Sequence, residues 1–242
     1  MCSVISLIFL LLLCTNAEAA LSFDAVSTGT AASSNTVSTT HTRGCGGTNT
    51  YAVVSVAWQL GTPGTVSSVS YGGTALALLR GQTIGGGDAR VEMWGVKAPP
   101  GGAQTVTATM SSTPNSLTMT TRTYCGVDQT TSTGTAVSAA NFLGTASVDA
   151  TSAAGELVVD AVVLYGGGEP LTVGSGQTER SNFYEGACCP PSHTHGTSEE
   201  AGAGTITMDW TQADSQYWAI VAVALKPAAT ATRRFSAPIV MQ

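Results

Sequence analysis

Short apolar or alternating runs, separated by glycine and proline, recur along the chain. Residues 50–60 (TYAVVSVAWQL) are apolar on both alternating faces, which is typical of a strand covered on both sides. Residues 205–226 form a long stretch without glycine or proline, but their β-branched content and the Asp214-Ser215 break favour a hairpin over a helix. The pattern predicts an all-β protein of about twelve strands.

Glycine and proline mark the expected turns. Gly72-Gly73 lies between two alternating runs, and a tight hairpin turn needs two adjacent residues that tolerate positive φ. Pro100-Gly101 is a further turn signal. Because an all-β chain must bury one face of each sheet against another, we expect a single two-sheet antiparallel β-sandwich, jelly-roll or Ig-like, over residues 21–227.

The two ends of the chain are interpreted separately from this domain. Residues 1–20 hold an apolar run followed by Ala17-Glu18-Ala19, the small-residue pattern of a cleavable secretory signal. That run is too short to span a bilayer. Residues 228–242 follow the last expected strand as a tail. We therefore expect a secreted or cell-surface protein without a membrane span.

The charge balance argues against a nucleic-acid partner. The formal net charge is −6, and removing Glu18 with the signal leaves fourteen acidic against nine basic residues. Nucleic-acid binding needs clustered lysine and arginine, whereas the adjacent pair Arg233-Arg234 lies in the tail.

Five turn-and-strand motifs stand out: SVSYGGTALALL, VEMWGVKAPPGGAQTVTAT, GVDQTT, TSAAGELVVDAV and YWAIVAVALKP. Together they resemble a widespread group of secreted bacterial β-sandwich domains of uncharacterised function, found as modules of exported or surface proteins. The resemblance covers residues 21–227. It implies a β-sandwich fold in an exported protein and carries over no catalytic residue. The Cys45 loop and the ACCPPSHTH segment depart from the pattern.

Four cysteines remain after the signal: Cys45, Cys125, Cys188 and Cys189. Export permits disulfides, and an even number fits complete pairing. A Cys188–Cys189 bridge would be strained, because adjacent cysteines approach more closely than relaxed disulfide geometry allows. We therefore favour the two pairings that join each of these residues to Cys45 or Cys125.

Candidate metal ligands gather just after these cysteines. If residues 192–196 are extended, His193 and His195 project to the same side, and Glu185, Glu199 or Glu200 could add an oxygen. A His-x-His pair without a fixed third ligand is a weak signal, so a loop held by disulfides is the preferred interpretation. We expect no cofactor.

An enzyme is the least favoured class. A glycosidase needs two carboxylates facing one cleft, and Glu92, Asp160 and Asp209 are strand acids that could supply them. Asp160 stands among valines, where a hydrogen-bonded or outward-facing acid is the common case. We therefore expect no catalytic residues, and keep a glycan-active enzyme only as the last alternative.

Two non-enzymatic functions remain. A structural or adhesive surface module fits the low charge and the Thr/Ser/Gly-rich strands. A carbohydrate-binding module would need exposed aromatic side chains that stack on a polysaccharide. Trp94 and Trp210 are the candidates for that role, whereas Trp58 and Trp218 lie in strands expected to be buried.

The tail offers a means of self-association. Ile239, Val240 and Met241 form a short apolar end, which we expect to add as a strand to an exposed sheet edge of a neighbouring subunit. A disordered terminus is the alternative. Repeated head-to-tail contacts of this kind would build a filament or a ring.

Overall fold

The computed structural model describes residues 20–59, 64–142, 144–166, 170–184, 193–213 and 216–229, and its regular elements there are all strands. The ladders between them are antiparallel, which confirms the predicted all-β antiparallel class. The strands are β1 (Ser22–Ala32), β2 (Thr36–Arg43), β3 (Thr50–Gln59), β4 (Val66–Tyr71), β5 (Thr74–Ala75), β6 (Ala77–Thr83), β7 (Ala89–Lys97), β8 (Gly102–Met110), β9 (Ser116–Cys125), β10 (Val137–Phe142), β11 (Ala146–Thr151), β12 (Leu157–Tyr165), β13 (Thr172–Val173), β14 (Thr178–Tyr184), β15 (His193–Ala201), β16 (Thr205–Thr211) and β17 (Tyr217–Leu225).

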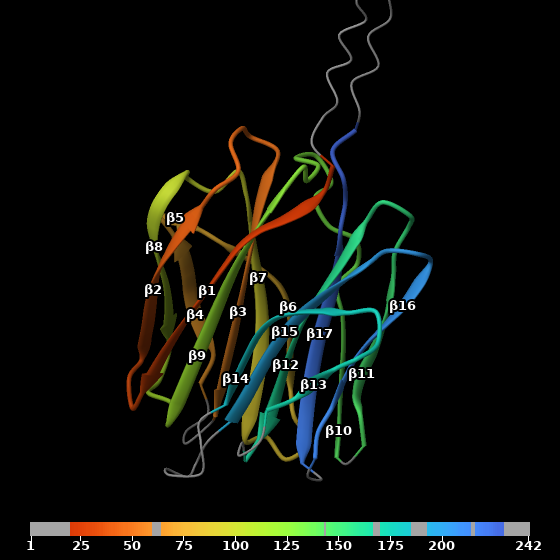
Figure 1. The fold of residues 1–242 in the computed structure, drawn as a ribbon. Helices are drawn as coiled ribbons and strands as arrows, with labels where there is room; N and C mark the ends of the chain where they lie inside the picture. The colour runs from red at the N-terminus through yellow and green to blue at the C-terminus, as the bar shows by residue number, and fades with distance from the viewer. Residues whose placement is uncertain are drawn as a thin grey trace, which may run out of the picture.

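These strands form four sheets stacked as four layers (Figure 1). The first half of the chain makes the N-outer sheet, in the order β2-β8-β4-β5, and the N-inner sheet, β1-β9-β3-β7-β6. The second half makes the C-inner sheet, β10-β17-β12-β15-β14, and the C-outer sheet, β11-β16-β13. The two inner sheets face each other, so the prediction of a single two-sheet sandwich is wrong.

The second half repeats the strand order of the first. If β10 is numbered as strand 1 of the second half, the inner sheet β10-β17-β12-β15-β14 has the order 1-8-3-6-5. The outer sheet β11-β16-β13 has the order 2-7-4. In the first half, with β4 and β5 counted together as the fourth strand, β1, β9, β3, β7 and β6 take the same inner places, and β2, β8 and β4 take the same outer places. This order follows the jelly-roll pattern, except that the fifth strand lies beside the sixth. The molecule therefore contains one topology twice.

Three apolar cores separate the four layers. The first half encloses Val37, Trp58, Tyr71, Val106 and Met119 between its sheets; the inner sheets enclose Val53, Val91, Ala161, Val163 and Val221; the second half encloses Val158, Met208, Trp210 and Ile220. Strand β3 is buried along its whole length because it contributes to two of these cores. A strand apolar on both faces thus signals a third layer, since the outer face of a two-sheet sandwich meets solvent.

The turns explain which strand pairings were predictable. Gly72 and Gly73 have φ of 53° and 81°, and they close the β4–β5 hairpin with Tyr71 opposite Thr74, as predicted. The expected hairpin over residues 205–226 is wrong. Strand β16 pairs with β11 and β13, whereas β17 pairs with β10 and β12 in the neighbouring sheet. The strands were right, but the chain changes layer between them.

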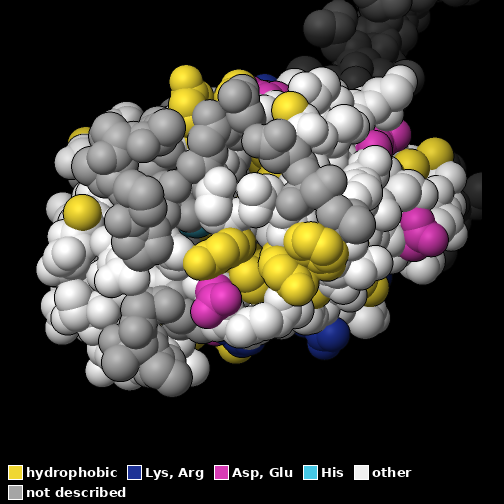
Figure 2. All heavy atoms as spheres, turned by 90° about the horizontal axis from the view of Figure 1, so that it is seen from below, with side chains coloured by type: hydrophobic (Ala, Val, Ile, Leu, Met, Phe, Trp, Pro, Cys, Tyr) yellow, Lys and Arg dark blue, Asp and Glu magenta, His cyan; other side chains and the backbone are white. Residues whose placement is uncertain are grey.

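The fold begins and finishes at one end of the molecule. Ser22 pairs with Cys125, and two residues further along Val127 forms an isolated bridge with Pro227. Figure 1 shows this end at the top. Figure 2 views the opposite end, where hydrophobic side chains gather in a cluster. No helix in the described residues is long and apolar enough to cross a membrane.

Candidate functional site

A polar seam joins the two inner sheets where β9 faces β15. On β9, Leu117 and Met119 point into the core of the first half, so Ser116 and Arg122, an even number of residues apart, point to the other face. That face meets β15, where His193 and His195 are fully buried. The seam thus brings together polar side chains from the two halves of the chain.

Each seam histidine is hydrogen-bonded to a serine of the first half. His193 Nδ1 lies 2.7 Å from Ser116 Oγ, and His195 Nε2 lies 3.3 Å from Ser55 Oγ. His195 Nδ1 is 3.0 Å from the Val162 carbonyl oxygen, which can only accept, so His195 carries its proton on Nδ1 and accepts from Ser55. Burial lowers the pKa of His193 to about 3 and that of His195 to about 4. Both rings are therefore neutral near pH 7.

The predicted metal site is incomplete in the described part of the chain. The two histidines do project to the same side, and His193 Nε2 has no hydrogen-bond partner among the described residues. Within those residues, the group of three ligand-type side chains that lie together is Asp24, Cys45 and Cys125, far from the histidines in sequence, and its two cysteines form a disulfide. Metal binding at His193 and His195 therefore stays a prediction.

Arg122 crosses the seam from β9. Its side chain is fully buried, with Nη1 donating to the Ser198 carbonyl at 2.9 Å and Nη2 to the Asp160 carbonyl at 2.8 Å. A guanidinium is a planar fork of donors, so it can hold carbonyls on two adjacent strands at once. Arg122 therefore fastens the N-inner sheet to both β12 and β15.

Asp160 points to the other face of β12, into the second half. Its Oδ1 accepts from the Ser198 N–H at 2.6 Å and the Ser198 hydroxyl at 2.9 Å, and its Oδ2 accepts from Trp210 Nε1 at 2.7 Å. Burial is the main cause that raises the pKa of this carboxyl, against the opposing hydrogen bonds. Of the two alternatives expected for Asp160, a hydrogen-bonded or an outward-facing acid, the structure shows the hydrogen-bonded one. Glu92 and Asp209 lie on β7 and β16, in two other sheets.

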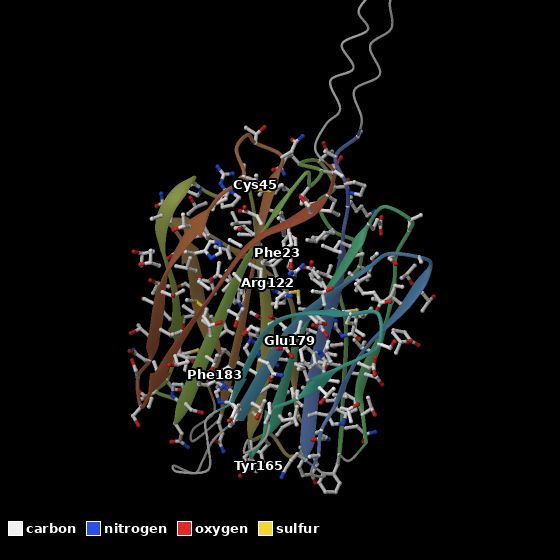
Figure 3. The ribbon with its side chains drawn as sticks, in the orientation of Figure 1. Phe23, Cys45, Arg122, Tyr165, Glu179 and Phe183 are labelled. Carbon is white, nitrogen blue, oxygen red and sulfur yellow. A yellow bond between two sulfur atoms is a disulfide. The ribbon has the colours of Figure 1, made fainter. Side chains whose placement is uncertain are left out.

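An ion pair and a cation–π contact close the edge of the seam. Arg180 of β14 pairs with the buried Glu199 of β15, and its guanidinium carbon lies 3.7 Å from the ring centre of Phe23 on β1. Figure 3 shows Phe23 and Arg122 on strands of the first half, with Glu179 and Phe183 on β14 of the second. The seam therefore continues to the edge strands of both inner sheets.

Cys45 and Cys125 form a disulfide with their Cα atoms 6.0 Å apart. The favoured pairings of these residues with Cys188 and Cys189 are therefore wrong, and the latter two lie outside the described residues. The reason is the position of the strand ends. Cys125 ends β9 and Cys45 follows β2 at the same end, where the Asp24 carboxylate accepts from the Cys45 N–H at 3.0 Å. A disulfide is compatible with an oxidising compartment.

The tryptophans chosen for sugar stacking do not form an exposed pair. Trp210 is fully buried, because it continues the inward-facing series Ile206 and Met208 on β16. Trp94 is half-buried, and its Nε1 donates to the Glu92 carboxylate at 3.1 Å. The prediction that Trp210 is exposed was therefore wrong, and the alternation with apolar neighbours indicated burial instead.

Sequence reasoning missed a different aromatic pair, Phe142 and Tyr217. They face each other across β10 and β17, with ring centres 4.3 Å apart and ring planes 37° apart. Their exposed fractions are 45 % and 37 %. Both stand at a strand end beside a turn, and this position is the signal that could have identified them.

Comparisons with protein-family models, with curated proteins and with solved structures found no match.

Proposed function

We propose that this protein is a secreted, non-enzymatic β-sandwich module with a structural or adhesive role outside the cell. The observation that carries the proposal is that charged and imidazole side chains are buried between the two halves and bond them together. Arg122, His193, His195 and Glu199 are buried and bonded at the contact between the repeated halves. Such bonds join the two similar halves into one four-layer body.

Two observations support export. The N-terminal segment has the form of a secretory signal, and Cys45 is paired with Cys125. A bridge that closes a loop over 80 residues is what an exported all-β domain can use to limit its unfolded state. The resemblance to exported bacterial sandwich modules points in the same direction.

Self-assembly through the tail is part of the proposal. Residues 230–242, with Ile239, Val240 and Met241, lie outside the described residues. Support comes from the C-outer sheet, where β13 pairs with β16 over two residues only, whereas its counterpart β4 is a six-residue strand. Asp209 is also occupied on this edge, because its carbonyl accepts from the Gly174 N–H and its N–H donates to Gln177 Oε1. The backbone of β16 from Thr205 to Met208 is therefore the edge to which an extended segment can add.

The test compares the mature chain, residues 21–242, with a chain ending at Ala229. This end point retains the Ala228 N–H, which donates to the Gly126 carbonyl at 2.7 Å. We expect filaments or rings from the longer chain in negative-stain electron microscopy. The shorter chain should be monomeric in light scattering with the same melting temperature. A monomeric mature chain at high concentration would rule out assembly.

A further inference from the structure

We propose that the end of the C-inner sheet farthest from Ser22 and Pro227 binds a polysaccharide through a row of aromatic side chains. Phe142 and Tyr217 contribute most of the affinity. The inference deepens the adhesive role proposed above, because it names the class of ligand. It depends on where the described chain exposes its aromatic rings.

Exposed aromatic residues of the described chain are confined to one end of one sheet. Among the described residues, the exposed large hydrophobic side chains are those of Val26, Leu78, Phe142, Tyr184 and Tyr217. The three aromatic members all stand at strand ends of the C-inner sheet. By contrast, the described part of the first half exposes none of its aromatic rings to this degree.

Three of the aromatic residues form one row. Phe142 is opposite Tyr217, and Leu164 is opposite Trp218, so the adjoining residues Tyr165 and Tyr217 lie at the same level on adjacent strands. These three side chains are on the face that packs against the N-inner sheet, whereas Tyr184 is opposite Thr194 and points to the other face. Three strand ends at the usual spacing give a row about 10 Å long. Half-buried Tyr165 lies within it at the lower end of Figure 3.

The Phe142–Tyr217 pair is held in position before any ligand arrives. Tyr217 has Phe142 on one side, and a Cβ placed on Gly85 would lie 3.6 Å from its ring, so the β6–β7 turn packs beside it. Gln212 Nε2 donates to the Gly144 carbonyl at 2.9 Å and to the Gln216 carbonyl at 3.3 Å, which ties together the turns that follow Phe142 and precede Tyr217. Rings fixed on strand ends lose little entropy on binding.

The surroundings favour a sugar over another protein. The C–H face of a sugar ring is apolar and complements the negative face of an aromatic ring. Figure 2 shows a small hydrophobic cluster with an acidic group at its margin and basic groups nearby. A narrow glycan chain fits such a row, whereas a protein partner needs a patch of about 800 Å².

The experiment measures binding of the mature protein to microcrystalline cellulose and chitin by sedimentation, and to soluble β-glucan and xylan by affinity electrophoresis. We expect binding to at least one of these polysaccharides. Phe142→Ala and Tyr217→Ala should each weaken it about tenfold, which corresponds to about 1.4 kcal/mol. Tyr217→Phe keeps the ring and should retain most of the affinity.

Leu78→Ala is the matched control, because Leu78 is equally exposed on β6 but lies opposite Trp94, away from this end. Unchanged melting temperatures establish that each variant is folded. Absence of binding to all four probes, or equal loss with Leu78→Ala, would overturn the inference. Loss of self-association in Phe142→Ala would also overturn it, because the occupant would then be a second copy. Filaments without polysaccharide binding would leave the proposed structural role standing and remove only the sugar site.

Discussion

The two halves share a strand order but fill the corresponding core position differently. The residues of β3 that face the N-outer sheet are Ala52, Val54, Val56 and Trp58, whereas β12 faces the C-outer sheet with Val158, Asp160, Val162 and Leu164. Counted along the strands, Val54 of the first half takes the place of Asp160 in the second. The same topology therefore accepts either a valine or a buried acid at this position, provided that every oxygen of the acid is hydrogen-bonded.

Val54→Asp is expected to have the largest effect of the substitutions considered. Val54 is fully buried, and the first half lacks counterparts of Ser198 and Trp210 to bond a carboxylate at this site among the described contacts. Because an unpaired buried charge is costly, we expect the free energy of unfolding to decrease by more than about 4 kcal/mol, or the variant to fail to fold. Chemical denaturation measures it. A variant as stable as the natural chain would show that the halves are not distinguished by their polar partners.

Removal of the Cys45–Cys125 disulfide tests how much a covalent bond stabilises the first half. Cys45→Ser together with Cys125→Ser should destabilise the protein by about 4 kcal/mol, because the bridge closes a long loop in the unfolded chain. Urea denaturation of oxidised, reduced and doubly substituted protein gives the value. Full stability in the reduced protein would contradict the assignment of this bridge as a stabilising element.

Acid should weaken the seam through its histidines. Both folded-state pKa values, about 3 and about 4, are below the ordinary value of 6.5, so the unfolded chain binds more protons in this interval. The contribution of the two neutral histidines to the free energy of unfolding is complete above pH 6.5. As the pH falls below this value, it decreases by about 1.4 kcal/mol per pH unit for each histidine. The raised pKa of Asp160 acts in the opposite direction. Melting temperatures between pH 7 and pH 4 test this.

Replacement of both histidines separates their effect from that of the carboxyl groups. A His193→Gln/His195→Gln variant should be less stable at pH 7 but show a shallower decline toward pH 4. His41 is also buried, with a pKa that burial lowers, and it is retained as the internal reference of the first half. An unchanged pH profile in the double variant would show that the seam histidines do not govern acid sensitivity.

Trp210→Phe should have the smallest effect of this series. A phenyl ring replaces the larger indole, and Asp160 Oδ2 loses the donor that lies 2.7 Å away. We expect about 1 to 3 kcal/mol, the usual result of leaving a buried acceptor unpaired. In a Trp210→Phe/Asp160→Asn background the loss should be less than additive, which a double-mutant cycle measures. Strict additivity would mean that the two side chains are not coupled.

Local features of the fold were predictable from sequence, whereas the arrangement of layers was not. Gly72 and Gly73 specify their hairpin because both residues adopt positive φ. The doubly apolar pattern of residues 50–60 predicts a strand covered on both faces, and β3 is such a strand because it lies between two cores. The repeat was missed because β3 and β12 share only a valine-rich pattern. The hairpin expected at residues 205–226 failed because sequence neighbours can belong to different sheets.

The site was less predictable, because its partners are distant in sequence. The orientation of His193 and His195 to one side was correctly predicted from strand periodicity. Their partners Ser116 and Ser55 lie 77 and 140 residues away, and nothing local specifies them. The pairing of Cys45 with Cys125 likewise depends on which strand ends meet. Trp210 was the avoidable error, since its spacing from Ile206 and Met208 places it on the buried face.

The position of the chain ends gives the molecule a direction. Ser22 and Pro227 are held at one end by Cys125 and Val127, while Phe142, Tyr217 and Tyr184 stand at the other. If the protein is held at the end that contains Ser22 and Pro227, its exposed aromatic side chains lie at the opposite end, away from the attachment. Pulling on that opposite end would load the inner strands lengthwise, so that rows of backbone hydrogen bonds share the force instead of opening one by one.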